Sequence, residues 1–198
     1  MRTIIVFLFT FSLINSCRKS DHEVNLPDSS KAYYTDFNGR EIKMNKHTAV
    51  DLNRDGETDI SFGTLLVGDP VFGVDKHQYI VSTSINSFLP VDHNEKMPVL
   101  QDGDSVPVEN FGGYTWYNAA YNVLAQKIIG VDKSSYWEGS WKDARHKYIP
   151  VQVKTRSLRY NGWVEISFDM VGEKIILHRA ALNKQPETSI TCEKTLQK

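Results

Sequence analysis

Cysteine is nearly absent from this 198-residue chain, which contains only Cys17 and Cys192. A fold held together by several disulfide bonds is therefore excluded. Long hydrophobic runs are missing as well, because the longest, Ile4–Ile14, is shorter than the roughly 20 apolar residues of a membrane-spanning helix. The sequence has no internal repeat and almost no helical periodicity, which argues against repeat proteins and helical bundles.

Charge of one sign is not in excess either, since 23 Lys and Arg residues stand against 24 Asp and Glu residues. Nucleic-acid binding requires a basic face, so no nucleic-acid partner is predicted. The sequence contains no GxSxG, no HExxH and no phosphate-binding glycine loop. Several carboxylates could act as an acid/base pair, but their spacing does not distinguish them from solvated positions, and no catalytic residue is predicted. These carboxylates are Glu138, Asp143, Glu165 and Asp169.

The N-terminus is typical of an exported protein. Arg2 precedes the short apolar run, which ends in Leu13-Ile14-Asn15-Ser16-Cys17 and resembles a bacterial lipobox. We predict a lipoprotein signal peptide over residues 1–16, lipidation of Cys17, a polar tether over 17–31 and a single domain over 32–198. Lipidation would attach the protein to the bacterial cell envelope, most simply at the outer membrane. The alternative is ordinary secretion with cleavage near this position.

An acidic loop follows the first strand signals. Oxygen-bearing side chains occupy loop positions 1, 3, 5 and 9 as Asp51, Asn53, Asp55 and Asp59, and glycine stands at position 6. This spacing suits a calcium ion, to which the carbonyl group of Glu57 at position 7 would add a further oxygen. Carboxylates held close together repel one another, and a divalent cation removes that cost. We therefore predict a structural calcium site.

A plain acidic turn is the alternative to calcium, because Asp-Gly between two apolar runs also signals a β-hairpin. The loop is not an EF-hand, since position 12 is Phe62 instead of glutamate and no helical pattern flanks it. It resembles the DxDxDGxxD loops of integrin-type propeller repeats and thrombospondin type 3 repeats, which carry many copies. A single copy favours a structural role for calcium.

Short alternating strands dominate the remainder of the domain. Val164, Ile166 and Phe168 should face inward, whereas Trp163 has the opposite parity and indicates a second packed layer. Strands are also predicted over 32–37 and 41–44, joined by a turn at Asn38-Gly39, and over 47–52, 60–67, 79–86, 123–129, 148–154, 163–170 and 174–178. The predicted fold is all-β, an antiparallel β-sandwich, with jelly-roll-like and immunoglobulin-like topologies both open.

The chain shares a family resemblance through four segments, which are VDLNRDGETDISF, KYIPVQV, YNGWVEISFD and IILHRAALNKQPETSI. Their order resembles that of uncharacterised secreted proteins and lipoproteins of Bacteroidota, which pair an acidic DxNxDGxxD loop with a late GWV strand. The resemblance covers roughly residues 33–191. It implies a location in the cell envelope and a β-sandwich fold, and it implies no activity.

Aromatic residues crowd the segment from Phe111 to Trp141. Trp116, Trp137 and Trp141 would stack on sugar rings if they were exposed together, or would close the core if they were buried. Our leading hypothesis is a non-catalytic binding module for a glycan or a protein partner. A carbohydrate-active enzyme with scattered carboxylates and a purely structural envelope protein are the alternatives.

Overall fold

The computed structural model describes residues 31–130 and 134–193. Every regular element in these ranges is a β-strand, which confirms the predicted all-β class. The strands are β1 (Ala32–Ile42), β2 (Thr48–Val50), β3 (Ile60–Asp69), β4 (Val74–Thr83), β5 (Ser87–Val91), β6 (Ser105–Val106), β7 (Thr115–Tyr117), β8 (Asn122–Gly130), β9 (Tyr136–Glu138), β10 (Lys147–Thr155), β11 (Leu158–Asp169), β12 (Lys174–Asn183) and β13 (Ile190–Thr191). The predicted signal peptide, Cys17 and the tether as far as residue 30 lie outside these ranges, within which no helix could cross a membrane.

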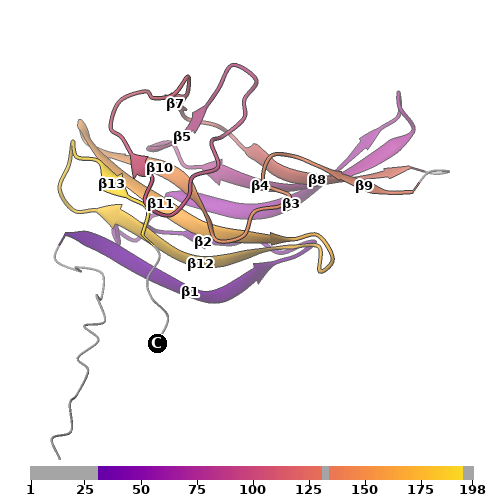
Figure 1. Ribbon diagram of the computed structural model, residues 1–198, viewed down its shortest axis with the longest axis horizontal. Helices are drawn as coiled ribbons and strands as arrows, with labels where there is room; N and C mark the ends of the chain where they lie inside the picture. The colour runs from indigo at the N-terminus through magenta and orange to yellow at the C-terminus, as the bar shows by residue number, and fades with distance from the viewer. Residues whose placement is uncertain (1–30, 131–133, 194–198) are drawn as a thin grey trace, which may run out of the picture.

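Two antiparallel sheets pack as a sandwich (Figure 1). One sheet has six strands in the order β1-β12-β11-β10-β5-β7, and the other has five in the order β2-β3-β4-β8-β9. The predicted turn at Asn38-Gly39 is wrong, because β1 continues through these residues. Both have positive φ angles, and the register against β12 shifts between Asp36 and Arg40, so the pair forms a bulge.

The main core lies between the two sheets. Val164, Ile166 and Phe168 of β11 are buried there with Phe62 of β3, as their alternation predicts. Trp141 is also fully buried in this core. Burial of large apolar side chains is the main source of the sandwich's stability.

A second core covers the other face of the six-stranded sheet, as the parity of Trp163 predicts. Trp163 packs edge-on against Tyr148 at 5.1 Å, and its indole N–H donates to the Thr191 carbonyl oxygen at 3.0 Å. Cys192 is fully buried in the same cluster. The short pairing of β6 with β13 therefore closes a second apolar layer over β10, β11 and β12.

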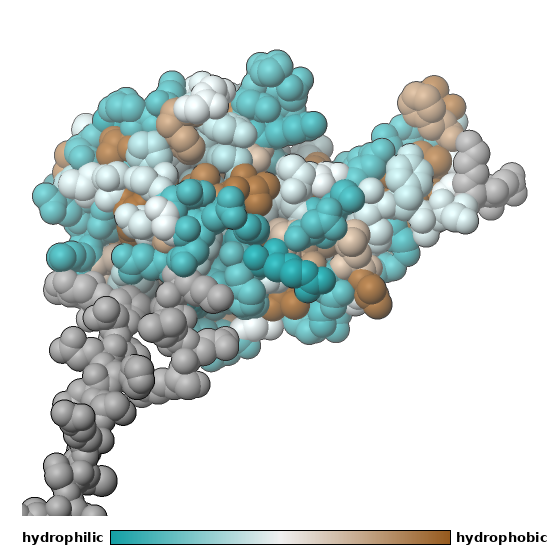
Figure 2. Space-filling view, viewed as in Figure 1, coloured by the Kyte–Doolittle hydropathy of each residue, from teal (hydrophilic) through white to brown (hydrophobic). Residues whose placement is uncertain are grey.

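A long arm projects from the sandwich (Figure 1, right). We define the arm as residues 64–78, 126–130 and 136–138, which belong to β3, β4, β8, β9 and the β3–β4 turn. β3 and β4 pair over their full length, from Ile60 opposite Thr83 to Asp69 opposite Val74. Figure 2 shows that apolar residues gather at the tip of the arm and that the outline is indented between the arm and the body.

Candidate ligand-binding cleft and acidic loop

A row of polar side chains crosses the outer face of the five-stranded sheet. Gln78 of β4 stands opposite Gln126 of β8, and Gln126 stands opposite Glu138 of β9. The Gln78 Nε2 group donates to Gln126 Oε1 at 2.9 Å, and the Gln126 Nε2 group donates to Glu138 Oε2 at 3.0 Å. These bonds hold three side chains from three strands in one line.

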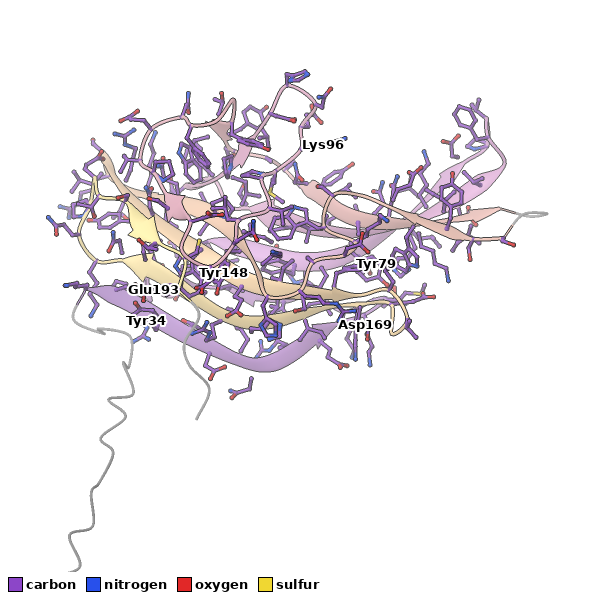
Figure 3. The ribbon with its side chains drawn as sticks, in the orientation of Figure 1. Tyr34, Tyr79, Lys96, Tyr148, Asp169 and Glu193 are labelled. Carbon is purple, nitrogen blue, oxygen red and sulfur yellow. The ribbon has the colours of Figure 1, made fainter. Side chains whose placement is uncertain are left out.

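The row forms part of the wall of a cleft of about 930 Å³. This volume lies in the range of small-molecule sites, roughly 300–1,000 Å³. Lys96 lies in the loop after β5, on the side nearest the arm (Figure 3). The cleft is lined by Gln78, Asn94, Glu95, Lys96, Ala120, Tyr121, Asn122, Val123, Gln126, Glu138, Gly139 and Ser140.

Two contacts fix the walls of the cleft. The Asn122 Nδ2 group donates to the Glu95 carbonyl oxygen at 2.6 Å and joins the start of β8 to the turn after β5. Gly139 has a φ of 111° and packs so closely on the Leu124 carbonyl oxygen that a Cβ atom would lie 2.6 Å from it. Any side chain at position 139 would push the segment after β9 away from β8.

The cleft offers hydrogen-bonding groups and one exposed aromatic ring. Its amides both donate and accept, its carboxylates accept, and Tyr121 is half exposed. Gln78 Oε1 is buried and has no hydrogen-bond partner among the described residues, so one acceptor of the row is left without a hydrogen bond. Such a surface suits a ligand that is rich in hydroxyl groups and has an apolar face.

The acidic loop is a hairpin connection, as its flanking residues predict. β2 and β3 pair from Thr48 opposite Phe62 to Val50 opposite Ile60. Arg54 and Gly56 have φ angles of 64° and 91°, which let the loop reverse within a few residues. The Arg54 guanidinium points out of the loop, where it donates to the Tyr34 carbonyl oxygen at 2.7 Å.

The side chains of the acidic loop turn toward its own backbone. The two Asp51 carboxylate oxygens accept the amide hydrogens of Arg54 at 2.7 Å and Gly56 at 2.9 Å. Asn53 Oδ1 accepts from the Asp55 amide at 2.9 Å, and Asp55 Oδ1 accepts from the Glu57 amide at 2.8 Å. The loop is therefore already shaped by its Asx side chains.

Asp59 is the buried member of the loop. Its Oδ2 atom accepts the amide hydrogens of Leu52 at 2.7 Å and Asn53 at 3.3 Å, and the residue is only 4% exposed. Burial, together with the negative charges of Asp55 and Asp51, raises the pKa of the Asp59 carboxyl to about 6, although the two amide hydrogen bonds act in the opposite direction. Asp59 ties the loop to the sheet.

Calcium binding stays a prediction. A pocket of about 260 Å³ separates Asn53, Asp55 and Asp59 from Lys154 and Arg156 near the β10–β11 turn, so basic groups share this space with the acidic loop. Within residues 31–130 and 134–193, no group of three or more His, Cys, Asp or Glu side chains is arranged to hold a metal ion. A complete shell would need the Asn53 amide and backbone carbonyl oxygens as well.

The three tryptophans are not brought together. Trp141 is fully buried and has no surface for a sugar ring. Trp137 is partly buried and packs on Tyr79 and Phe168, with ring centroids 5.8 and 5.2 Å apart, whereas Trp116 packs in the second core. A stacking platform made of all three is therefore wrong, because each ring contributes to one of the two cores.

The carboxylates named from the sequence are also dispersed. Glu138 lies in the cleft, but Glu165 is buried on the opposite sheet between Arg179 and His146, with oxygen–nitrogen distances of 2.7 Å to each. Asp169 caps the β11–β12 turn by accepting backbone amide hydrogens. The structure thus gathers only one of the four carboxylates into the candidate site.

Sequence reasoning missed most of the cleft. Gln78, Gln126 and Tyr121 belong to no motif, and their proximity depends on strand pairing across 48 residues. Comparison with protein-family models, with curated proteins and with solved structures found no match.

Proposed function

We propose that this chain is a non-catalytic glycan-binding module of the bacterial cell envelope and that the cleft on the five-stranded sheet is its ligand site. The observation that carries the proposal is the polar row Gln78–Gln126–Glu138 in a cleft that also contains the half-exposed Tyr121. Amide and carboxylate groups fixed in a row match the spaced hydroxyl groups of a sugar. An exposed tyrosine ring matches the apolar C–H face of the same sugar.

The charges of the cleft narrow the ligand class. Glu95 and Glu138 are acidic and Lys96 is basic, so the lining lacks the basic excess that a phosphorylated or sulfated glycan requires. A neutral oligosaccharide carries no charge that the carboxylates of this site could repel. The proposed ligand is therefore a neutral glycan that binds along the polar row.

Binding to a panel of neutral polysaccharides, measured by affinity gel electrophoresis and calorimetry, tests this function. Tyr121→Ala should weaken binding about tenfold, which corresponds to about 1.4 kcal/mol of stacking. Gln126→Ala should weaken it as well, because two hydrogen bonds of the row are lost. Tyr117→Ala is the matched control, since Tyr117 is 60% exposed and lies outside the cleft.

Two results would contradict the proposal. Wild-type protein that binds no neutral glycan would leave the cleft without a sugar ligand and would favour a purely structural envelope protein. Release of sugar products by the wild type, abolished by Glu138→Gln, would make the protein a carbohydrate-active enzyme.

We also propose that calcium binds the acidic loop and stabilises the fold. The spacing of the acidic side chains, the loop shaped by Asp51 and Asn53, and the buried Asp59 support this role. Free calcium at ten times its dissociation constant should add about 1.4 kcal/mol, or about 3–5 °C in Tm. EGTA should remove this gain, and Asp55→Ala should abolish the response, whereas Asp143→Ala on the exposed surface should preserve it. A Tm that is the same with calcium and with EGTA would refute the ion site.

Lipid attachment at Cys17 would keep the module at the membrane. The supporting observation is the lipobox-like segment that ends at Cys17. Cys17→Ala should move the protein from the membrane fraction to the soluble fraction. Continued retention in membranes would show that something other than lipid holds it there.

A further inference from the structure

The outer edge of β3 is only partly covered. β2 pairs with Ile60–Phe62, and the preceding loop reaches Thr64, whose Oγ1 atom accepts the Asn45 amide hydrogen at 3.2 Å. Beyond this point, no strand among the described residues pairs with the outer edge of Leu65–Asp69. Alternate residues of an unpaired edge direct their N–H and C=O groups outward, where they can pair with another strand.

This edge lacks the features that protect most edge strands. The sequence Leu65-Leu66-Val67-Gly68 contains no charge and no proline, and the side chains of its first three residues are 37%, 64% and 40% exposed. The turn that follows exposes Val71 and Phe72 at 85% and 77%. Natural edge strands are usually blunted by lysine, proline or a bulge. An uncharged apolar edge is therefore suited to strand pairing.

We propose that this edge pairs with the same edge of a second copy of the chain and forms a two-fold symmetric dimer through the arms. Antiparallel pairing of Leu65–Asp69 with itself places Val67 opposite its own copy, on the two-fold axis. No like charges face each other, because Leu65–Gly68 are uncharged and Asp69 is already paired with Lys76 at 2.8 Å.

The second copy also covers the apolar tip of the arm. In this antiparallel arrangement, the Val71–Phe72 turn of one copy lies beside the segment before β2 of the other copy. That segment exposes 51% of Met44, which offers an apolar contact to the Val71–Phe72 turn. The self-complementary pattern of edge, tip and segment favours a second copy over an unrelated strand.

The dimer leaves the rest of the molecule accessible. The start of β1 lies at the end of the sandwich away from the arm (Figure 1). Edge-to-edge pairing of antiparallel strands keeps the same face of each sheet on the same side. The two five-stranded sheets would therefore form one continuous sheet with both polar rows on one face.

Disulfide trapping in cells that express the full chain tests the dimer. Opposed residues in an antiparallel pair have Cα atoms about 4.5–5.5 Å apart, which suits a disulfide bond. Under mild oxidation, Val67→Cys, which opposes its own copy, should give a band of twice the monomer mass on a non-reducing gel, and Leu66→Cys, which opposes Gly68, should give a weaker one. Val171→Cys is the matched control, because Val171 is 97% exposed on the β11–β12 turn and belongs to neither the β3 edge nor the segment before β2.

A charge on the edge should break the dimer. Adding Leu66→Lys to Val67→Cys should abolish the cross-linked band, while an unchanged Tm would show that the fold is intact, since Leu66 is largely exposed. Mass spectrometry of the band should find this chain alone. The proposal is overturned if neither cysteine variant cross-links, if Val171→Cys cross-links equally, if the lysine leaves the band intact, or if the band contains another protein.

Discussion

Replacing His77 with phenylalanine should stabilise the folded protein, and most strongly at acidic pH. His77 is 1% exposed, and neither ring nitrogen has a hydrogen-bond partner among the described residues. Its ring lies 4.6 Å from that of Tyr79 at the base of the arm (Figure 3 labels Tyr79). Phenylalanine keeps this ring contact and removes the two buried polar atoms.

The size of the effect follows from the cost of an unsatisfied buried polar group, about 1–3 kcal/mol. For a domain of this length, each kcal/mol corresponds to about 2–4 °C in Tm. The pH dependence has a definite sign. Burial lowers the pKa of His77 from 6.5, with Lys127 acting in the same direction and Glu173 against it. The neutral ring therefore contributes stability above pH 6.5, and this contribution is lost as the pH falls below 6.5 toward the folded-state pKa.

Urea denaturation followed by tryptophan fluorescence at pH 7.5, 6.5 and 5.5 measures this difference. The stability difference between His77→Phe and wild type should widen as the pH falls, because only the wild type takes up a proton at residue 77 on unfolding, which favours its unfolded state. The exposed His93 provides the control, and the stability difference between His93→Phe and wild type should not change with pH. A destabilised His77→Phe, or a gap that does not depend on pH, would refute the reasoning.

Three further predictions concern the second core and the buried ion pair. Gly162→Ala should cost about 3 kcal/mol in urea denaturation, because its Cβ atom would lie 2.4 Å from the Ala181 carbonyl oxygen, and an unchanged midpoint would contradict this. Cys192 should not react with a thiol reagent at pH 8 in the folded protein, since burial raises the pKa of its thiol to about 12, and it should react fully in urea. Glu165→Ala should cost about 2–3 kcal/mol, less than for a fully buried pair because the Arg179 side chain is 20% exposed; a loss below 1 kcal/mol would count against it.

The alternation of apolar residues was sufficient to predict the all-β class and the two faces of β11. Val164 and Phe168 face the main core and Trp163 faces the second, as a period of two requires. The stretch from Val123 to Ile129, which also had helical features, is a strand because β4 and β9 pair with its two edges. Local pattern alone could not exclude a helix there.

The cleft could not be predicted in the same way. Gln78 and Gln126 belong to no motif, and only the register of β4 against β8 brings them into one row. The sequence does place Asp59 in the acidic loop, but nothing local indicates that this member, and not Asp55, is the buried one. Burial depends on the neighbouring strands, which a loop motif does not specify.

The pairing of β1 with β12 has a consequence for how the chain folds as it is synthesised. β1 (Ala32–Ile42) forms an antiparallel pair with β12 (Lys174–Asn183). The first strand of the domain therefore cannot pair until nearly the last strand has been made. Contacts this far apart in sequence slow folding and leave strand edges open meanwhile. A chain that emerges N-terminus first therefore leaves β1 without its partner until residue 183 is free, and its assembly should be more sensitive than its final stability to the loss of a chaperone that holds unfolded chains.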